Sequence, residues 1–140
     1  MTTRHTETVL ITGASSGIGL DLAKCFAAEG CRLVLVARNT EALQALADEL
    51  RATHACETRV LPADLGDPES PDRIYDALQQ AGVTVDVLVN NAGFGAHGDF
   101  AALPLPRQLE MVQVNVTALM HLTGLFLPDM RARRRGSVLN

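Results

Sequence analysis

A glycine-rich stretch from Thr12 to Gly19 constrains the fold of this chain more than any other feature. Its sequence is Thr-Gly-Ala-Ser-Ser-Gly-Ile-Gly, and its glycines are Gly13, Gly17 and Gly19. The apolar run 9–12 before it predicts a buried β-strand, and residues 20–28 after it predict a helix. A helix N-terminus presents unpaired N–H groups and the positive end of the peptide dipoles, which favour an anion by about 0.3–1 kcal/mol. The order strand, glycine turn, helix therefore predicts a phosphate-binding turn; the alternative is a turn that binds no ligand.

The residues of this turn have separate predicted roles. Gly13 lets the chain leave the strand tightly, Gly17 lets the backbone approach a diphosphate without a Cβ atom, and Gly19 lets the helix pack closely on the sheet. Hydroxyl or N–H groups of three further residues are placed to contact phosphate, unless they serve turn chemistry alone. These residues are Ser15, Ser16 and Ile18.

Strand and helix patterns alternate along the following chain. A continuous apolar run, typical of a strand buried on both faces, occupies residues 33–37, and two further strands are predicted at 60–63 and 85–89. Asn39 or Thr40 caps a helix after the first run, and the pair at 67–68 opens another helix, which stops at Gly82. Pro62 indicates that its strand lies at a sheet edge. The alternation predicts an α/β fold with a doubly wound parallel sheet and right-handed crossovers.

A second motif, Asn90-Asn91-Ala92-Gly93, follows the run 85–89. Together with the glycine spacing at 12–19, which differs from the commoner G-x-G-x-x-G, it resembles the short-chain dehydrogenase/reductase family over essentially the whole chain. The resemblance implies a Rossmann-type sheet in the order 3-2-1-4, with a fifth strand beginning at 136–140. Residues 1–140 would then be a dinucleotide-binding Rossmann domain, truncated after the start of the fifth strand and lacking the catalytic C-terminal part.

The resemblance also implies roles for five residues outside the glycine turn. Asp64 would receive the adenine amino group, unless it only caps the next turn. Asn90, Ala92 and Gly93 would flank the adenosine ribose, or the asparagines would only satisfy the backbone at the strand end. Asn115 would lie behind the active site and hold a water molecule that relays protons. The alternative for Asn115 is a buried helix amide that bonds a backbone carbonyl.

The charge after the second predicted strand distinguishes the two nicotinamide cofactors. NAD-binding sheets usually carry Asp or Glu there, hydrogen-bonded to the ribose 2′-hydroxyl. Here the strand ends Val36-Ala37-Arg38-Asn39. A guanidinium group pairs well with a 2′-phosphate, so Arg38 predicts NADP(H) as the cofactor. The alternative is a solvated surface arginine.

The catalytic residues of the family are missing from this sequence. Its chemistry needs a serine, then a tyrosine with a lysine four residues later, the tyrosine acting as general acid or base. Ser137 comes too early to be that serine, Tyr75 is the only tyrosine, and Lys24 is the only lysine. We therefore expect a chain that is inactive because it is truncated, since a cut within a strand leaves an apolar sheet edge unprotected.

Three functions fit these patterns to different degrees. The first is an NADP(H)-dependent oxidoreductase that passes hydride between nicotinamide and a carbonyl or alcohol substrate. The second is a non-catalytic NADP(H)-binding module or interaction subunit, which the absent tyrosine and lysine favour. The third, a methyltransferase, is weaker, because its sheet would need an acid where Arg38 stands.

Composition argues against some classes of partner and indicates a cellular compartment. A net charge of −4 argues against nucleic acid. Three cysteines without C-x-x-C spacing indicate reduced thiols, a cytoplasmic location and no zinc site, and four scattered histidines add no metal pattern. No run of about 18 uncharged apolar residues stands out, so we expect no membrane span.

A long helix is predicted over 104–130, with apolar residues around nearly its whole circumference. A helix of this kind is buried on several sides. One side needs the sheet, so the other needs a partner. We expect a homo-oligomer contact through this helix, or else burial under further C-terminal segments.

Overall fold

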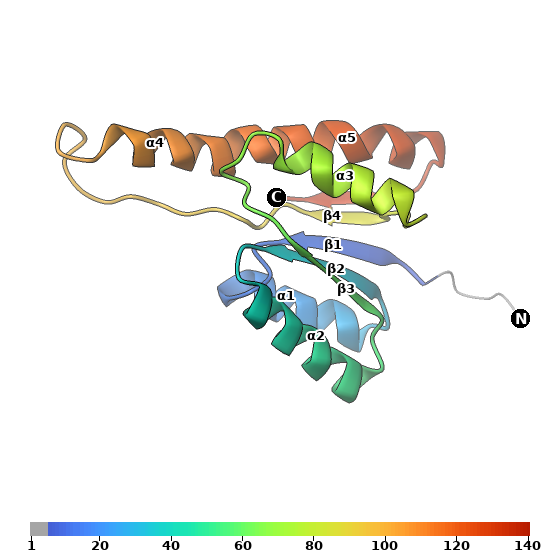
Figure 1. Cartoon of the computed structure of the whole chain (residues 1–140). Coiled ribbons are helices and arrows are strands. Elements are labelled where there is room, and N and C mark those ends of the chain that lie inside the picture. The colour runs from blue at the N-terminus through green and yellow to red at the C-terminus, as the bar shows by residue number, and fades with distance from the viewer. Residues whose placement is uncertain (1–5) are drawn as a thin grey trace, which may run out of the picture.

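Five parallel strands, rich in valine, leucine and isoleucine, form one sheet. The computed structural model of the protein describes residues 6–140. The strands are β1 (Thr8–Thr12), β2 (Arg32–Ala37), β3 (Thr58–Pro62), β4 (Val87–Val89) and β5 (Ser137–Leu139). Their order is β3-β2-β1-β4-β5, with every pairing parallel (Figure 1). This confirms the predicted doubly wound sheet and its order, and Pro62 lies on an edge strand as predicted.

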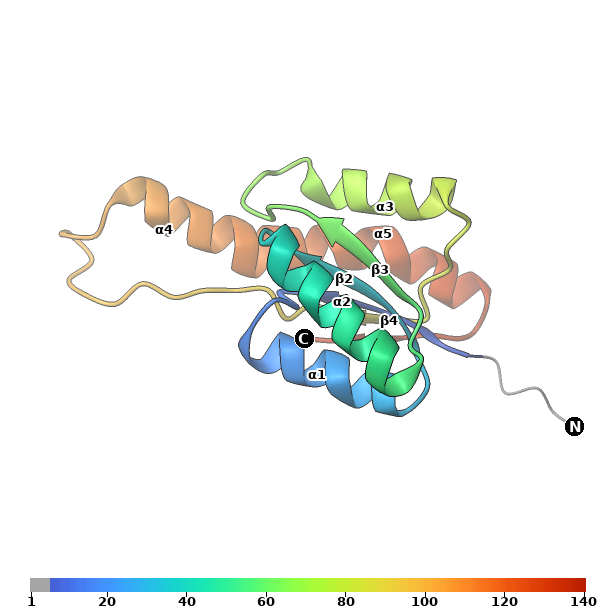
Figure 2. The ribbon, with the colours of Figure 1, turned by 60° about the horizontal axis from the view of Figure 1, so that its bottom comes forward.

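Helices cover both faces of the sheet. They are α1 (Gly17–Ala28), α2 (Thr40–His54), α3 (Ser70–Gln80), α4 (Leu105–Val112) and α5 (Leu119–Ala132), with a π-helical segment, η1 (Gln113–Ala118), between the last two. Helices α1 and α2 lie on one face, and α3 and α5 on the other (Figures 1 and 2). Because strand side chains alternate between faces, Val9 and Ile11 pack in the core under α1 and α2, while Leu10 packs under α3 and α5.

Two helix starts show how local side chains set the boundaries. Asn39 caps α2 as predicted, since its Oδ1 accepts a hydrogen bond of 3.0 Å from the Ala42 N–H. The next helix begins at Ser70, later than predicted. There Asp67 Oδ1 accepts a hydrogen bond from the Glu69 N–H at 3.0 Å, which makes a turn before the helix.

The long helix predicted at 104–130 is observed as α4, η1 and α5, residues 105–132. It is buried on one side only, against the sheet, through Ala118, Leu122, Phe126 and Met130. Five other apolar side chains are between 50% and 68% exposed: Leu105, Leu109, Val112, Val116 and Met120. The side against the sheet is therefore buried as predicted, and the cover expected for the other side, by a second copy or by further C-terminal segments, stays a prediction.

One helix bears on the expectation of no membrane span, which stays a prediction. The helix from Leu105 to Ala132 is 28 residues long, and an 18-residue window within it has a mean hydropathy of 1.3. The helix therefore has the length and composition of a membrane span, and 17% of that window is buried inside the structure. The buried part of this helix packs on the sheet through Ala118, Leu122, Phe126 and Met130, and most of the window is not buried in this chain.

Candidate functional site

A cleft of about 470 Å³ lies at the carboxyl ends of the strands. It is lined by the segments that follow β1, β2, β3 and β4, together with two residues of the long helix. The lining consists of Gly13, residues 15–18, 36–39, 63–65 and 91–94, Glu110 and Val114. Open α/β sheets bind ligands at this edge. The structure brings most of the predicted site residues together here, except Gly19, Asn90 and Asn115.

The glycine turn has the backbone that only glycine adopts easily. Gly13 and Gly17 have positive φ angles of 67° and 56°. A Cβ at Gly13 would lie 2.9 Å from both Ala92 Cα and Asn91 Nδ2, whereas a Cβ at Gly17 would meet nothing within 4 Å. A Cβ at Gly19 would collide with the Gly13 carbonyl oxygen and with Asn91. Gly19 thus lets the helix pack on the turn itself, rather than on the sheet at large.

The first turn of α1 is left uncapped beside the cleft. Ser16 is the N-cap residue, but its side chain makes no capping hydrogen bond, and the first turn carries no acidic residue. The N–H groups of Gly17, Ile18 and Gly19 have no intrahelical acceptor, because helix geometry leaves the first donors unpaired. The Ile18 side chain is 72% exposed. These unpaired donors lie at the positive end of the helix dipole, an arrangement that favours an anion.

One hydroxyl joins the glycine turn to the opposite wall of the cleft. Thr12 Oγ1 accepts hydrogen bonds from the backbone N–H groups of Asn91, at 3.1 Å, and Ala92, at 2.9 Å, and donates to the Val89 carbonyl at 3.3 Å. Asn91 Nδ2 donates to the carbonyls of Thr12, at 3.0 Å, and Gly13, at 3.2 Å. Asn91 thus satisfies the backbone at a strand end, as the structural alternative for the asparagines described, whereas the sequence analysis gave the Thr12 hydroxyl no role.

Asn90 lies away from the cleft and is 8% exposed. Its Nδ2 donates to Thr123 Oγ1 at 3.1 Å and to Asn140 Oδ1 at 3.0 Å. Those contacts tie β4 to α5 and to the end of β5. Asn90 thus has a structural contact, but with side chains and not with the strand-end backbone that the alternative named. Ala92 and Gly93 do line the cleft.

Arg38 lies in the cleft wall just after β2 and is exposed. Within residues 6–140 it forms no ion pair with a carboxylate. Its neighbour Asn39 is occupied in capping α2. The guanidinium group is therefore available to an anion bound in the cleft.

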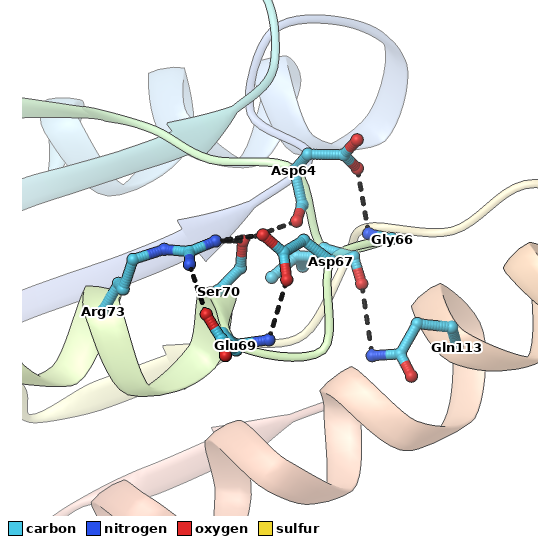
Figure 3. A network of polar contacts seen from close by, with 8 residues as sticks. Asp64, Gly66, Asp67, Glu69, Ser70, Arg73 and Gln113 are labelled. Atoms are coloured by element: carbon cyan, nitrogen blue, oxygen red, sulfur yellow. Dashed lines mark hydrogen bonds and ion pairs between the residues drawn. The ribbon is translucent and has the colours of Figure 1, made fainter.

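Asp64 belongs to a loop that is held from two sides (Figure 3). Its Oδ1 accepts the Gly66 N–H at 2.9 Å, and its carbonyl accepts the Ser70 hydroxyl at 2.6 Å. From the long helix, Gln113 donates to the Leu65 carbonyl at 3.4 Å. Asp64 thus caps its own turn, as the alternative foresaw, and also lines the cleft.

Arg73 of α3 fastens the other end of this loop. Its guanidinium group pairs with Asp67 and, at 3.1 Å, with Glu69 (Figure 3). The backbone N–H of Glu69, and then the guanidinium of Arg73, lower the pKa of the Asp67 carboxyl below its ordinary value. Within this loop, the charged form of Asp67 is thus favoured by the Glu69 N–H and by Arg73.

Asn115 lies in η1 and is exposed, so the expectation of a buried amide is wrong for this chain. Its Oδ1 accepts the Phe94 N–H at 3.0 Å, and its Nδ2 donates to the Phe94 carbonyl at 2.8 Å. The carbonyl it bonds belongs to the loop after β4, not to its own helix. Asn115 thereby fixes the segment that begins at Gly93, whose Cβ position would lie 3.0 Å from Asn115 Oδ1.

Tyr75 lies outside this site. The ring of Tyr75 packs edge-to-face on Phe126 at 5.1 Å between centroids, and its hydroxyl donates to Asp129 at 3.1 Å, so it holds α3 against α5 away from the cleft. No cluster of metal-ligating side chains occurs in the part of the chain that the structure describes.

Comparisons with known proteins agree with this geometry. The family model described as short chain dehydrogenase matches residues 7–140. Ketoacyl reductase HetN of Nostoc is 33% identical over 140 residues, which are 100% of this chain and 48% of that protein. A Drosophila melanogaster protein named dehydrogenase/reductase SDR family protein 7-like is 37% identical over 139 residues, 94% of this chain and 41% of that protein. The chain thus spans less than half the length of these relatives.

Solved structures show the same arrangement. A short-chain dehydrogenase from Sphingobium yanoikuyae, in complex with NADPH, is 36% identical with a TM-score of 0.88, covering 94% of this chain and 51% of that one. L-Sorbose reductase from Gluconobacter frateurii, complexed with NADPH and L-sorbose, is 32% identical with a TM-score of 0.88, covering 95% and 51%.

Proposed function

The chain belongs to the short-chain dehydrogenase family, and we propose that it forms the NADP(H)-binding part of an oxidoreductase. The proposed reaction passes hydride between nicotinamide and a carbonyl or alcohol substrate. The observation that carries the choice of cofactor is the exposed guanidinium of Arg38 in the cleft wall, without a carboxylate partner in residues 6–140. The two NADPH-bound relatives support it.

The cleft suits the parts of such a dinucleotide. The uncapped N–H groups at the start of α1 would hold the diphosphate, with Ser15 and Ser16 beside them. Arg38 would hold the 2′-phosphate of the adenosine ribose. Asp64 would receive the adenine amino group, and Ala92 and Gly93 would flank the ribose.

Replacing Arg38 by alanine tests this assignment. A charge-assisted hydrogen bond is worth about 1.5–3 kcal/mol, so Arg38→Ala should weaken NADPH binding about ten- to a hundredfold and leave NADH binding nearly unchanged. Calorimetric titration with both cofactors measures the two affinities. Arg131→Ala is the matched control, because it removes the same charge from an exposed position on α5 outside the cleft. An unchanged NADPH-to-NADH ratio in Arg38→Ala would contradict the proposal.

We also propose that residues 1–140 bind the cofactor without turning it over. Neither Tyr75 nor Lys24 lines the cleft, and they are the only tyrosine and lysine in the sequence. A non-catalytic NADP(H)-binding module remains the second candidate for the same reason. NADPH oxidation assayed with a panel of ketones and aldehydes should stay at background for this chain, whereas measurable turnover would overturn this point. Location in the cytoplasm stays a prediction, as does the absence of membrane and nucleic-acid partners.

A further inference from the structure

Two carboxylate groups converge at the cleft end between the β3–α3 loop and the long helix. Asp64 Oδ1 and Glu110 Oε1 lie 3.1 Å and 3.4 Å from the position that a Cβ atom would take at Gly66. Both residues line the cleft. Glycine at position 66 keeps this corner open, since a side chain there would press on both carboxylates. Like charges that converge in this way favour a ligand that donates hydrogen bonds to both.

Glu110 is held so that one oxygen is occupied and the other faces this corner. Its Oε2 pairs with Arg107 at 2.8 Å, and the Arg107 guanidinium lies 3.7 Å from the centroid of the Phe94 ring. The backbone of Phe94 is in turn fixed by the Asn115 amide. The Glu110 side chain is 32% exposed. The contacts with Arg107, and through it with Phe94, therefore hold the Glu110 carboxylate so that Oε1 faces the cleft.

Two apolar residues line the cleft next to this pair of carboxylates. Val114 lies one helical turn beyond Glu110 on the same side of the long helix and lines the cleft, as does Leu65. Apolar walls with a pair of acceptors at one edge fit a flat aromatic ring that carries an amino group at that edge.

Building on the proposed function, we propose that Glu110 selects adenine as the base of the dinucleotide. Its Oε1 accepts one N–H of the exocyclic amino group, while Asp64 accepts the other. The amino group has two donors, so it satisfies both carboxylates. Hypoxanthine carries a carbonyl oxygen at that position, which would face two carboxylates and be rejected.

The test compares NADPH with its analogue in which hypoxanthine replaces adenine, in the wild-type chain and in Glu110→Gln. The wild-type chain should bind NADPH more tightly than the analogue. Loss of one charge-assisted bond should lower that preference about tenfold in Glu110→Gln. Part of the change should come from tighter binding of the analogue, because the glutamine amide nitrogen can donate to the hypoxanthine oxygen. A purely structural role of Glu110 would not produce this gain.

Control measurements keep the outcomes distinct. Glu57→Gln removes an exposed carboxylate outside the cleft and should leave the preference unchanged. Equal weakening of both cofactors in Glu110→Gln, or an unchanged preference, would overturn the role of Glu110 while leaving the proposed function intact. If the wild-type chain bound neither dinucleotide, the proposed function itself would fail.

Discussion

Thr12 shows how much one buried hydroxyl decides about the site. It is 1% exposed, accepts two backbone N–H groups from the opposite wall, and donates to a third residue. Without it, the N–H groups of Asn91 and Ala92 would lose their acceptor in a half-buried position. A polar group left unsatisfied in this way costs about 1–3 kcal/mol.

Thr12→Val therefore has a predictable effect, because valine keeps the shape but removes the hydroxyl. The free energy of unfolding should fall by about 1–3 kcal/mol, and NADPH binding should weaken because the glycine turn and the 91–93 wall lose their connection. Urea unfolding and cofactor titration measure the two effects. Thr8→Val is the matched control on the same strand, since Thr8 is also buried but its hydroxyl makes no hydrogen bond within residues 6–140. Equal losses of unfolding free energy and of NADPH affinity in both variants would show that the hydrogen bonds of the Thr12 hydroxyl are not the cause.

At the scale of elements, the sequence patterns predicted the strands of the sheet better than the side-chain contacts that join the loops around the cleft. Apolar stretches identified β1, β2 and β4 because strands buried on both faces need such side chains along their length. The edge strand β3 is only partly buried, but its apolar residues were enough to place it. The roles of Thr12, Asn91 and Glu110 were not predictable in the same way. Their partners lie far along the chain, as with Asn91 and Thr12, 79 positions apart, and no local pattern records that distance. Asn115 was misjudged because its polarity in an apolar helix was taken as burial.

The β3–α3 loop is an element whose order should depend on pH. Because the folded-state pKa of Asp67 is lowered, this carboxylate stabilises the fold above its ordinary pKa, and the contribution is lost as pH falls through the lowered value. Acid should therefore loosen the Asp67–Arg73 contact and, with it, the position of Asp64.

Asp67→Asn should remove this part of the acid dependence. We expect the variant to be less stable than the wild-type chain near neutral pH. The difference should begin to shrink below about pH 4, where Asp67 becomes protonated in the unfolded chain, and should vanish once the pH has fallen through the lowered folded-state pKa. Unfolding by urea across this pH range measures the difference. Asp76→Asn on α3 is the control, because Asp76 is exposed and makes no ion pair within the described chain. A stability difference between wild type and Asp67→Asn that stayed constant with pH would argue against the charge of Asp67 as the cause.

At the scale of the whole molecule, the long helix carries a stripe of exposed apolar side chains that nothing in residues 6–140 covers. Its members recur at spacings of three and four residues, so they share one helix face: Leu105, Leu109, Val112, Val116 and Met120. Contiguous exposed apolar patches mark interaction surfaces. A helix face that pairs with its own copy would give a two-fold dimer, and cover by other polypeptide would satisfy the same surface.

Sedimentation of the 140-residue chain separates these two occupants. Self-pairing predicts a dimer at micromolar concentration, and Val116→Glu should convert it to a monomer, because a charge at the centre of an apolar interface is costly to bury. Ala52→Glu, on the exposed side of α2, should leave the dimer unchanged. NADPH affinity should stay the same in both variants, since neither position lines the cleft. A wild-type chain that sediments as a monomer would exclude self-pairing at that concentration, and cover of the stripe by other polypeptide would then be the explanation to pursue.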